Sequence, residues 1–396
     1  MIEFSDFLNR DNSIFCEDIY EYNSVLSDKV ENSTFLVIGG AGSIGQAVVK
    51  QIFRRNPKKL HVIDISENNL TELVRDIRSS FGYIQGEFKV FSLDIGSDIF
   101  NSFIDSQKTY DYVINLSALK HVRSEKDPFT LMRMIDVNIV NTYTSIQKAI
   151  EKGSRKYFSV STDKAANPIN MMGASKKIME LFLLNKSNEI EISSTRFANV
   201  AFSDGSLLYS FLNRFSKNQP LVAPNDIKRY FISPQESGEL CLLSCLLGKN
   251  KELFFPKISK NLPEVSFKEM ALLFVEKNGY KPIECKSEDE ARSDASKLIK
   301  EGFWPCFFSP SDTTGEKDLE EFYTKKENVD FDLYHSIGVI KQKDVSNSPV
   351  LFNFLKNIKS LKDSGNWTKK QLVVLFKEVL NDFDYHDKRK YLDSKM

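Results

Sequence analysis

FLVIGGAGSIG, residues 35–45, is the stretch that decides the fold. Its first residues form an apolar run without polar alternation, which is typical of a strand buried on both faces of a parallel sheet. The glycines that follow allow a tight turn into a helix, whose first amides can approach a pyrophosphate. The spacing therefore predicts a dinucleotide site at Gly39, Gly42, Ser43, Ile44 and Gly45.

Similar apolar runs recur along the first half of the chain, at residues 60–64, 88–94, 112–118 and 157–161. Periodic, helix-like stretches lie between the runs, at residues 44–55, 67–80 and 129–152. This alternation predicts an α/β fold, a Rossmann-type doubly wound parallel sheet with crossover helices. Ligands bind beyond the carboxyl ends of the strands in such a sheet, so we expect the site residues directly after the strands.

The end of the second predicted strand carries an acid. Asp64 lies 19 residues after Gly45, where a carboxylate can accept hydrogen bonds from an adenosine ribose, which favours NAD over NADP. A helix N-cap by Asp64 or Ser66 is the alternative. After the third strand, Asp94 and Ile95 could bracket the adenine, or form a plain turn. Ser66 belongs to the same predicted cofactor-binding set.

Beyond residue 200, predicted strands and helices no longer alternate regularly. We expect a smaller α/β substrate lobe there. Residues 285–330 are charged and largely helical in pattern, with interruptions at Trp304-Pro305 and Thr313-Thr314-Gly315. The last fifty residues read as two amphipathic helices, at 349–362 and 368–383. The predicted parts are an N-terminal helical extension (1–33), an NAD-binding Rossmann domain (34–200), a substrate-binding lobe (201–340) and a C-terminal helical tail (341–396).

The composition argues against several classes of protein. The 396 residues contain 54 Lys and Arg against 54 Asp and Glu, so we expect neither nucleic acid nor a membrane among the partners. The five cysteines show no C-x-x-C spacing and the four histidines no ligand spacing, so we assign no metal. The acidic first residues and the absence of a long apolar run favour a soluble, cytoplasmic protein.

The run STDKAANPINMMGASK, residues 161–176, follows the fifth predicted strand. Thr162 supplies a hydroxyl, and Asp163 and Lys164 add an acid and an amine directly after it. Met172 and Lys176 are four residues apart, so their side chains lie one turn apart on one helix face. We take these five residues as the catalytic candidates.

This run resembles the UDP-N-acetylglucosamine 4,6-dehydratases, extended short-chain dehydrogenases/reductases of polysaccharide and nonulosonic-acid biosynthesis. A branch of that family has Met in place of the Tyr of Tyr-x-x-x-Lys, and the segment through TTGEK is most similar to enzymes of the legionaminic-acid route. The resemblance implies a UDP-sugar substrate, a homo-oligomer and NAD as cofactor. Ser117, Ala118, Lys120 and Lys176 would complete the cofactor-binding set. Its other matching segments are NLSALKHV (115–122), DVNIVNT (136–142), RFANV (196–200), RYF (229–231) and TTGEK (313–317).

The implied reaction moves a hydride from sugar C4 to NAD, removes the C5 proton, expels the C6 hydroxyl as water and returns the hydride to C6. It needs an acceptor for the 4-hydroxyl proton, a base for C5 and an acid for the C6 hydroxyl. The resemblance supports Asp163 as the acid and Lys164 as the base, which requires a protonated Asp163 and a neutral Lys164. A thioether cannot accept the 4-hydroxyl proton, so Lys176, Thr162, Asp163 or a water must do so.

The resemblance also implies a set of substrate-binding residues. Lys120 would lie near the cofactor ribose or the substrate, and Asn199 near the substrate or its diphosphate. Arg229 could pair with phosphate oxygens through its guanidinium fork, although an ordinary salt bridge is an equal alternative. Glu316 and Lys317 correspond to a family segment near the nucleotide.

Two other functions remain open at this point. A nucleotide-sugar 4-epimerase of the same superfamily has no need of an acid/base pair for C5–C6 elimination, which Asp163 and Lys164 would supply. A non-catalytic NAD-sensing protein would explain the loss of the tyrosine. The retention of Asp163, Lys164 and Lys176 together argues against such decay.

Overall fold

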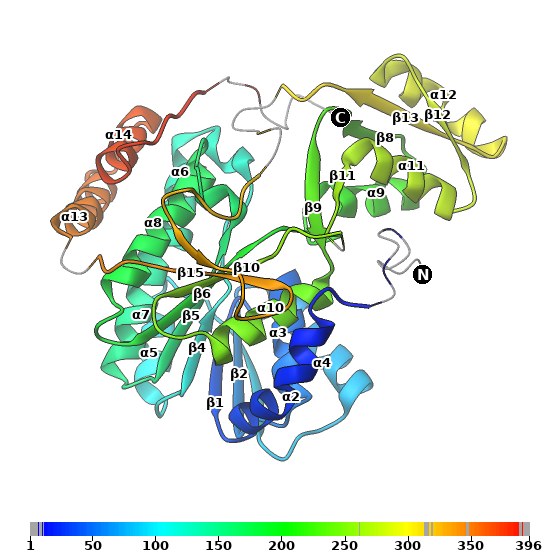
Figure 1. Cartoon of the computed structure of the whole chain (residues 1–396). Helices are drawn as coiled ribbons and strands as arrows, with labels where there is room; N and C mark the ends of the chain where they lie inside the picture. Colours follow the sequence, from blue (N-terminus) through cyan, green and yellow to red (C-terminus); the bar gives the residue numbers. More distant parts are fainter. Residues whose placement is uncertain are drawn as a thin grey trace.

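The computed structural model describes residues 7, 10, 12–260, 262–312, 317, 320–345, 348–387 and 390. A nine-stranded sheet runs through the centre of the larger body (Figure 1). Seven neighbouring strands are parallel, and β15 and β14 continue the sheet antiparallel beyond β10. In spatial order the strands are β14 (Asn328–Asp330), β15 (Ile337–Lys341), β10 (Glu252–Pro256), β6 (Glu191–Phe197), β5 (Lys156–Thr162), β4 (Tyr112–Asn115), β1 (Thr34–Ile38), β2 (Lys59–Asp64) and β3 (Glu87–Ser92).

This arrangement confirms the predicted α/β fold with a mainly parallel sheet. All five apolar runs of the first half form strands, and β1, β4 and β5 are buried almost throughout. The prediction of burial on both faces is wrong for β3, all of whose residues are exposed or half-buried. The reason is its position at the sheet edge, where only β2 pairs with it.

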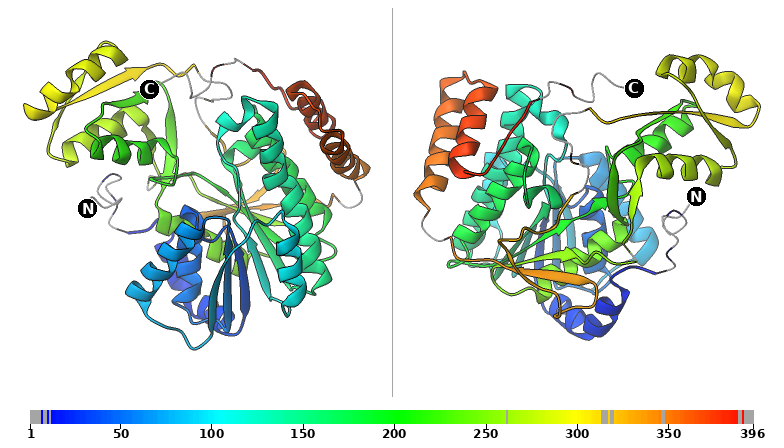
Figure 2. Two further views of the ribbon diagram at one scale, coloured as in Figure 1. Left: turned by 180° about the vertical axis from the view of Figure 1, so that it is seen from behind. Right: turned by 45° about the horizontal axis from the view of Figure 1, so that its top comes forward.

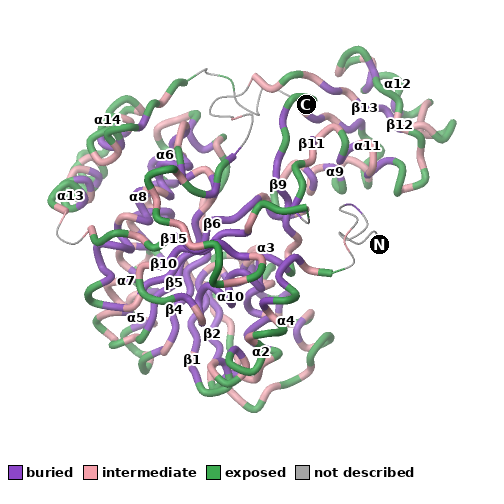
Figure 3. The backbone as a smooth tube through the Cα atoms, viewed as in Figure 1, coloured by how far each residue is buried: buried purple, intermediate pink, exposed green. Residues whose placement is uncertain are grey.

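Helices cover both faces of the large sheet. Alternate residues of β1 face two separate cores, because Phe35 and Val37 pack in one and Leu36 and Ile38 in the other. The first core is closed by α2 (Cys16–Glu31), α3 (Ser43–Phe53), α4 (Glu67–Phe81) and α10 (Pro234–Leu247). The second is closed by α5 (Asp98–Ser106), α7 (Asn141–Glu151) and α8 (Met171–Asn185). Figure 3 shows the buried strands between more exposed helices.

The helix predicted over residues 129–152 is continuous but not uniform. It consists of α6 (Pro128–Ile135), a wider π-helical turn (Asp136–Val140) and α7. The backbone stays right-handed helical across both junctions. A π turn inside an α-helix adds a residue to one turn and so re-aims the side chains around it.

A smaller lobe lies beside the carboxyl end of the large sheet (Figures 1 and 2). Its parallel sheet has the order β12 (Lys281–Glu284), β13 (Phe303–Ser309) and β8 (Leu221–Pro224). It is packed by α9 (Leu207–Ser216), α11 (Phe267–Lys277) and α12 (Glu288–Lys300). A second sheet, ordered β11 (Glu264–Ser266), β9 (Lys228–Ile232) and β7 (Asn199–Val200), connects the lobe to the larger body.

The prediction of a largely helical segment at 285–330 is wrong in its second half. Only α12 is helical among the described residues there, whereas β13 is the central strand of the lobe. The aromatic run of residues 303–308 is a strand-forming sequence that the surrounding charges concealed. The strands β10, β14 and β15, which fall within 201–340, belong to the large sheet.

Segments near both ends of the described chain pack on the larger body, whereas Phe7 lies in the core of the small lobe. The backbone amide of Ile14 donates to Glu236 of α10. At the other end, α13 (Pro349–Ser364) and α14 (Lys369–Val379) form a hairpin that packs against α6 and α8 through Phe354, Ile358, Leu372 and Phe376 (Figure 2). Within the described part of the chain, no helix has the length and apolar character needed to cross a membrane.

The packing of the small-lobe core depends on Trp304. This side chain is buried and stacks on Phe215, with 4.2 Å between the ring centres. We expect Trp304→Ala to lower the free energy of unfolding by about 3–5 kcal/mol, because a large cavity replaces the indole. Chemical denaturation measures the change. Phe307, only half-buried on the opposite face of β13, is the control. An equal loss from Phe307→Ala would contradict this account of the lobe.

Candidate active site

A cleft of about 460 Å³ opens at the carboxyl ends of β1, β4, β5 and β6. The volume lies within the range of small-molecule sites. The opposite wall comes from the loop before α9, from β9 and from the start of α11. Thirteen predicted site residues line it: Gly39, Gly42, Ser43, Ile44, Gly45, Ala118, Lys120, Thr162, Asp163, Lys164, Met172, Lys176 and Asn199.

The glycine loop is shaped by contacts that only glycine permits. Gly39 has a φ of +72°, and a Cβ on it would lie 2.6 Å from the amide of Ser117. A Cβ on Gly45 would lie 2.2 Å from the carbonyl oxygen of Gly39, so α3 packs directly on the turn. Gly42 is the N-cap residue of α3, and it has no side chain to accept a hydrogen bond from the first amides of the helix. The nearest atom to a Cβ there would be 3.7 Å away, which leaves room for a phosphate at the helix terminus.

Asp64 and Ser66 support this loop from the end of β2. The Asp64 carboxylate accepts one hydrogen bond from the amide of Ala41 (3.0 Å) and one from the amide of Ser66 (2.9 Å). Ser66 caps α4 by accepting from the amide of Asn69 (3.3 Å), as in the N-cap alternative. Each Asp64 oxygen accepts one protein hydrogen bond, which leaves lone pairs for a ribose hydroxyl.

Like Asp64 and Ser66, the predicted cofactor residues Asp94, Ile95 and Ser117 are not part of the cleft lining. Asp94 accepts a hydrogen bond from the amide of Gly96 (2.9 Å), as in the plain-turn alternative. Ile95 is buried in the core between the sheet and α5. Ser117 donates to the side chain of Asn115 (2.6 Å) and touches the glycine loop through its backbone.

Thr162, Asp163 and Lys164 form one hydrogen-bonded group where β5 ends. The Thr162 hydroxyl donates to Asp163 Oδ1 (2.8 Å), and the same oxygen accepts from the amide (2.8 Å) and the Nζ (3.1 Å) of Lys164. Burial lowers the pKa of Lys164, but the negative charges of Asp163 and Glu320 outweigh it and the pKa lies above its ordinary value. This arrangement favours the charged amine, whereas the proposed base chemistry requires Lys164 to lose a proton.

Met172 and Lys176 enter the cleft from α8. Asn170 caps this helix by accepting from the amide of Gly173 (2.7 Å). Lys176 Nζ donates to the carbonyl oxygen of Val160 (3.1 Å), which directs the amine to the end of β5. Burial lowers the pKa of Lys176 to about 8, although Glu180 opposes the shift.

Glu320 is a member of the site that the sequence prediction missed. Its carboxylate is buried and lies 3.4 Å from Lys164 Nζ and 4.0 Å from Arg229 Nη2. Arg229 thus faces a carboxylate, as in the salt-bridge alternative. Nothing in the run of charges around Glu320 distinguishes it from a solvated residue, apart from the aromatic pair two residues on.

The remaining predicted substrate residues lie in different surroundings. Lys120 Nζ donates to the hydroxyl of Ser203 (3.2 Å) across the cleft, and Asn199 Nδ2 donates to the carbonyl of Tyr230 (3.4 Å). Lys317 Nζ donates to the backbone carbonyl of Asn167. Glu316 lies outside the described residues.

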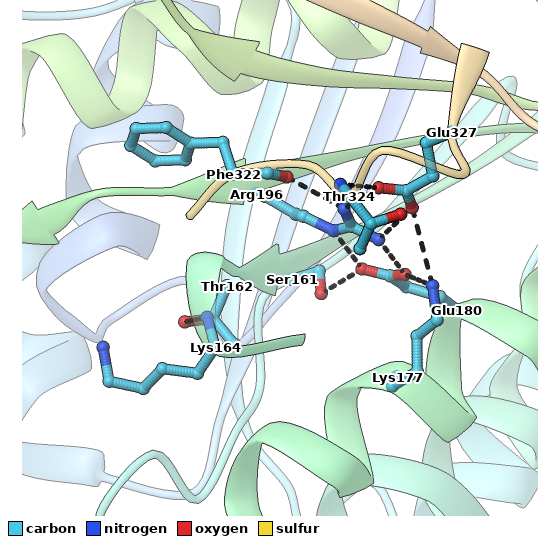
Figure 4. Close-up of polar contacts among 9 residues, drawn as sticks. All are labelled: Ser161, Thr162, Lys164, Lys177, Glu180, Arg196, Phe322, Thr324 and Glu327. Atoms are coloured by element: carbon cyan, nitrogen blue, oxygen red, sulfur yellow. Dashed lines mark hydrogen bonds and ion pairs between the residues drawn. The ribbon is translucent and has the colours of Figure 1, made fainter. Parts of the chain in front are cut away.

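A buried ion network fixes the walls of the cleft (Figure 4). Arg196 of β6 is fully buried and donates to both oxygens of Glu180 on α8, at 2.9 and 2.8 Å. It also donates to both oxygens of Glu327 and to the carbonyl of Phe322. Ser161, next to Thr162, donates to Glu180 (2.7 Å). The network thus joins β5, β6, α8 and the segment that carries Glu320.

Comparison with known proteins gives one family. The family model described as "Polysaccharide biosynthesis protein" matches residues 35–292. An uncharacterized membrane protein of Methanocaldococcus jannaschii is 29% identical, with 89% of this chain and 98% of that protein covered. The capsular polysaccharide biosynthesis protein CapD of Staphylococcus aureus is also 29% identical, over 73% of this chain. The chain spans about half (49%) of the length of CapD.

Solved structures share the fold at low identity. Pen from Bacillus thuringiensis has a TM-score of 0.64 at 21% identity, with 83% of this chain and 98% of that chain covered. DesIV, a dTDP-glucose 4,6-dehydratase from Streptomyces venezuelae, has 0.56 at 16%, covering 74% and 89%. A UDP-Glc/GlcNAc 4-epimerase from Campylobacter jejuni also has 0.56, at 18%, covering 74% and 92%. The likeness shows the fold and does not separate the two reactions.

We expect Arg196→Met to lower the free energy of unfolding at pH 7 by about 3–5 kcal/mol, because it leaves buried carboxylates without their main partner. Burial alone would raise the pKa of Glu180, but Arg196 and Lys177 lower it to about 2. Because this pKa is depressed on folding, the stabilisation is present above the ordinary value of 4.5 and is lost as the pH falls towards 2.

Denaturation at pH 7 and pH 3 checks this prediction. The loss in free energy of unfolding caused by Arg196→Met should be smaller at pH 3, where Glu180 can take a proton in the variant. An equal deficit at both values would show that the loss comes from packing rather than from charge.

Proposed function

The chain belongs to the polysaccharide biosynthesis protein family, and from this membership we propose that it is a nucleotide-sugar 4,6-dehydratase acting on UDP-N-acetylglucosamine with NAD as cofactor. The observation that carries the proposal is the hydrogen-bonded group of Thr162, Asp163 and Lys164 inside the cleft. Elimination of water across C5 and C6 needs such an acid/base pair, and Lys176 lies close by on α8.

The residues present fit a dinucleotide. The open helix terminus after Gly42 suits the pyrophosphate, and the remaining lone pairs of Asp64 suit the adenosine ribose. Lys176 would hydrogen-bond the nicotinamide ribose. When bound, NAD would accept a hydride from sugar C4 and return it to C6, so that no net oxidation results.

We assign the 4-hydroxyl proton to the pair of Thr162 and Asp163. Thr162 already donates to Asp163, so its oxygen can accept the sugar proton while its own proton passes to the carboxylate. Met172 has no part in this transfer. Asp163 thereby gains the proton that it later gives to the departing C6 hydroxyl, and water forms.

Lys164 takes the C5 proton in this scheme and later gives a proton back to C5. The proton from the 4-hydroxyl leaves in the water, so Thr162, Asp163 and Lys164 end each turnover as they began. This balance explains why a neighbouring carboxyl and amine are needed, whereas a 4-epimerase carries out no elimination. The relatives include UDP-glucose 4-epimerases of Rickettsia, one of them 28% identical over 62% of this chain, so epimerisation is the second candidate.

Mass spectrometry of the sugar nucleotide separates these functions. We expect the purified chain to convert UDP-N-acetylglucosamine to a product lighter by one water molecule. Lys164→Ala should abolish this loss without releasing the dinucleotide, whereas Lys325→Ala, at an exposed position, should turn over normally. Unchanged mass with a new sugar configuration would indicate epimerisation, and unchanged substrate with bound dinucleotide would indicate a sensor.

The cofactor is tested separately. Heat denaturation of the purified protein should release NAD, because a 2′-phosphate would meet the carboxylate of Asp64. Chromatography of the released dinucleotide identifies it. Recovery of NADP as the main species would contradict the assignment of Asp64.

A further inference from the structure

We propose that Glu320 is a positioning residue that accepts the proton of the Lys164 ammonium and so leaves Lys164 with the neutral amine that C5 chemistry needs. The inference rests on the proposed function. It answers a difficulty in that function, since Asp163 and Glu320 raise the pKa of Lys164 and so favour the charged amine, which is not a base.

Two carboxylates flank Lys164, and they differ in their hydrogen bonds. Oδ1 of Asp163 accepts three, from Thr162 and from the amide and Nζ of Lys164. Oε1 of Glu320 lies 3.4 Å from Lys164 Nζ, whereas its Oε2 is buried with no hydrogen-bond partner among the described residues. Hydrogen bonds donated to a carboxylate favour its ionised form. Glu320 is therefore the more ready acceptor of a proton.

The surroundings of Glu320 also favour its protonated form. The groups that face it are Asp163 and Lys164 at the end of β5, Arg229 of β9, and Lys317 of its own segment. Burial raises the pKa of Glu320, Asp163 adds to the shift, and the three cations do not cancel it. An isolated surface glutamate has no such bias towards the protonated form.

The transfer itself is balanced. One N–H bond of the Lys164 ammonium breaks and an O–H bond forms on Glu320, so an ion pair becomes an amine and a carboxylic acid. The total charge of the buried group does not change. Exclusion of water by a bound sugar favours this neutral pair, because a dry environment penalises separated charges.

The position of Glu320 is fixed by the residues that follow it. The carbonyl of Phe322 accepts from Arg196 (2.8 Å), and the Phe322 ring lies 5.9 Å from the rings of both Tyr230 and Phe255. At the other end of the segment, Glu327 accepts a hydrogen bond from Arg196. These contacts alone would hold the segment in place, so they do not explain a buried carboxylate with an unsatisfied oxygen.

The first test needs no turnover. NMR of the full chain with carboxyl-labelled glutamate follows the titration of Glu320, whose signal is the one lost in Glu320→Gln. We expect a midpoint above the ordinary value of 4.5, and a further rise of about one unit or more in Lys164→Met, because the variant removes a cation. A midpoint at the ordinary value that Lys164→Met leaves unchanged would overturn the proposal.

The second test is the pH profile of dehydration. Glu320→Gln should lower kcat near neutral pH on the order of 100-fold, with partial recovery as the pH rises and hydroxide replaces the missing acceptor. Glu320→Asp, which keeps a carboxyl, should restore the shape of the wild-type profile. A Glu320→Gln profile parallel to that of the wild type would show a structural role only.

Glu327→Gln is the matched control on the same segment. It removes a carboxylate that pairs with Arg196 and Lys177 but does not contact Lys164, so it should lower the Tm and leave the shape of the pH profile unchanged. Failure of the wild-type chain to dehydrate any UDP-sugar would refute the proposed function. The NMR titration would still decide whether Glu320 and Lys164 are coupled.

Discussion

A guanidinium without access to water must have its charge met by carboxylates, and this constraint organises the molecule around Arg196. Its partners come from α8 and from a segment far along the chain, and Ser161 of β5 joins the same group. Several of the candidate functional residues lie within four positions of a member of this network. Thr162 follows Ser161, Lys176 precedes Glu180 by one turn, and Glu320 precedes Phe322. The electrostatic requirement of one buried side chain thus sets the geometry of a cleft that it does not line.

Most of the strand framework could be predicted from the sequence, because buried parallel strands leave unbroken apolar runs. The glycine loop was equally visible, since its residue type follows from close backbone contacts at Gly39 and Gly45. The position of β3 at the sheet edge was not visible, because edge and centre are properties of the assembled sheet. The strand β13 was missed for a local reason, namely a short aromatic run beside a long charged helix.

The candidate site was predictable where its residues are neighbours in sequence. Thr162, Asp163 and Lys164 are adjacent, and Met172 and Lys176 share one helix face, so a motif could reveal them. Glu320 is brought to Lys164 only by folding, and its sequence surroundings are those of a solvated segment. The pKa of Lys164 is raised by the adjacent Asp163 and also by this distant carboxylate, whose contribution no local motif reveals.

The helix α8 is enclosed on two sides, by the sheet core through Met179 and Leu183 and by the α13–α14 hairpin through Ile178 and Phe182. Lys176 therefore stands on a wall that cannot tilt without opening two cores at once. The opposite wall belongs to a lobe with a separate core of its own. A change in the width of the cleft therefore requires movement of the small lobe. Such movement would admit a ligand and release water, while the reactive groups on the larger body keep their mutual distances.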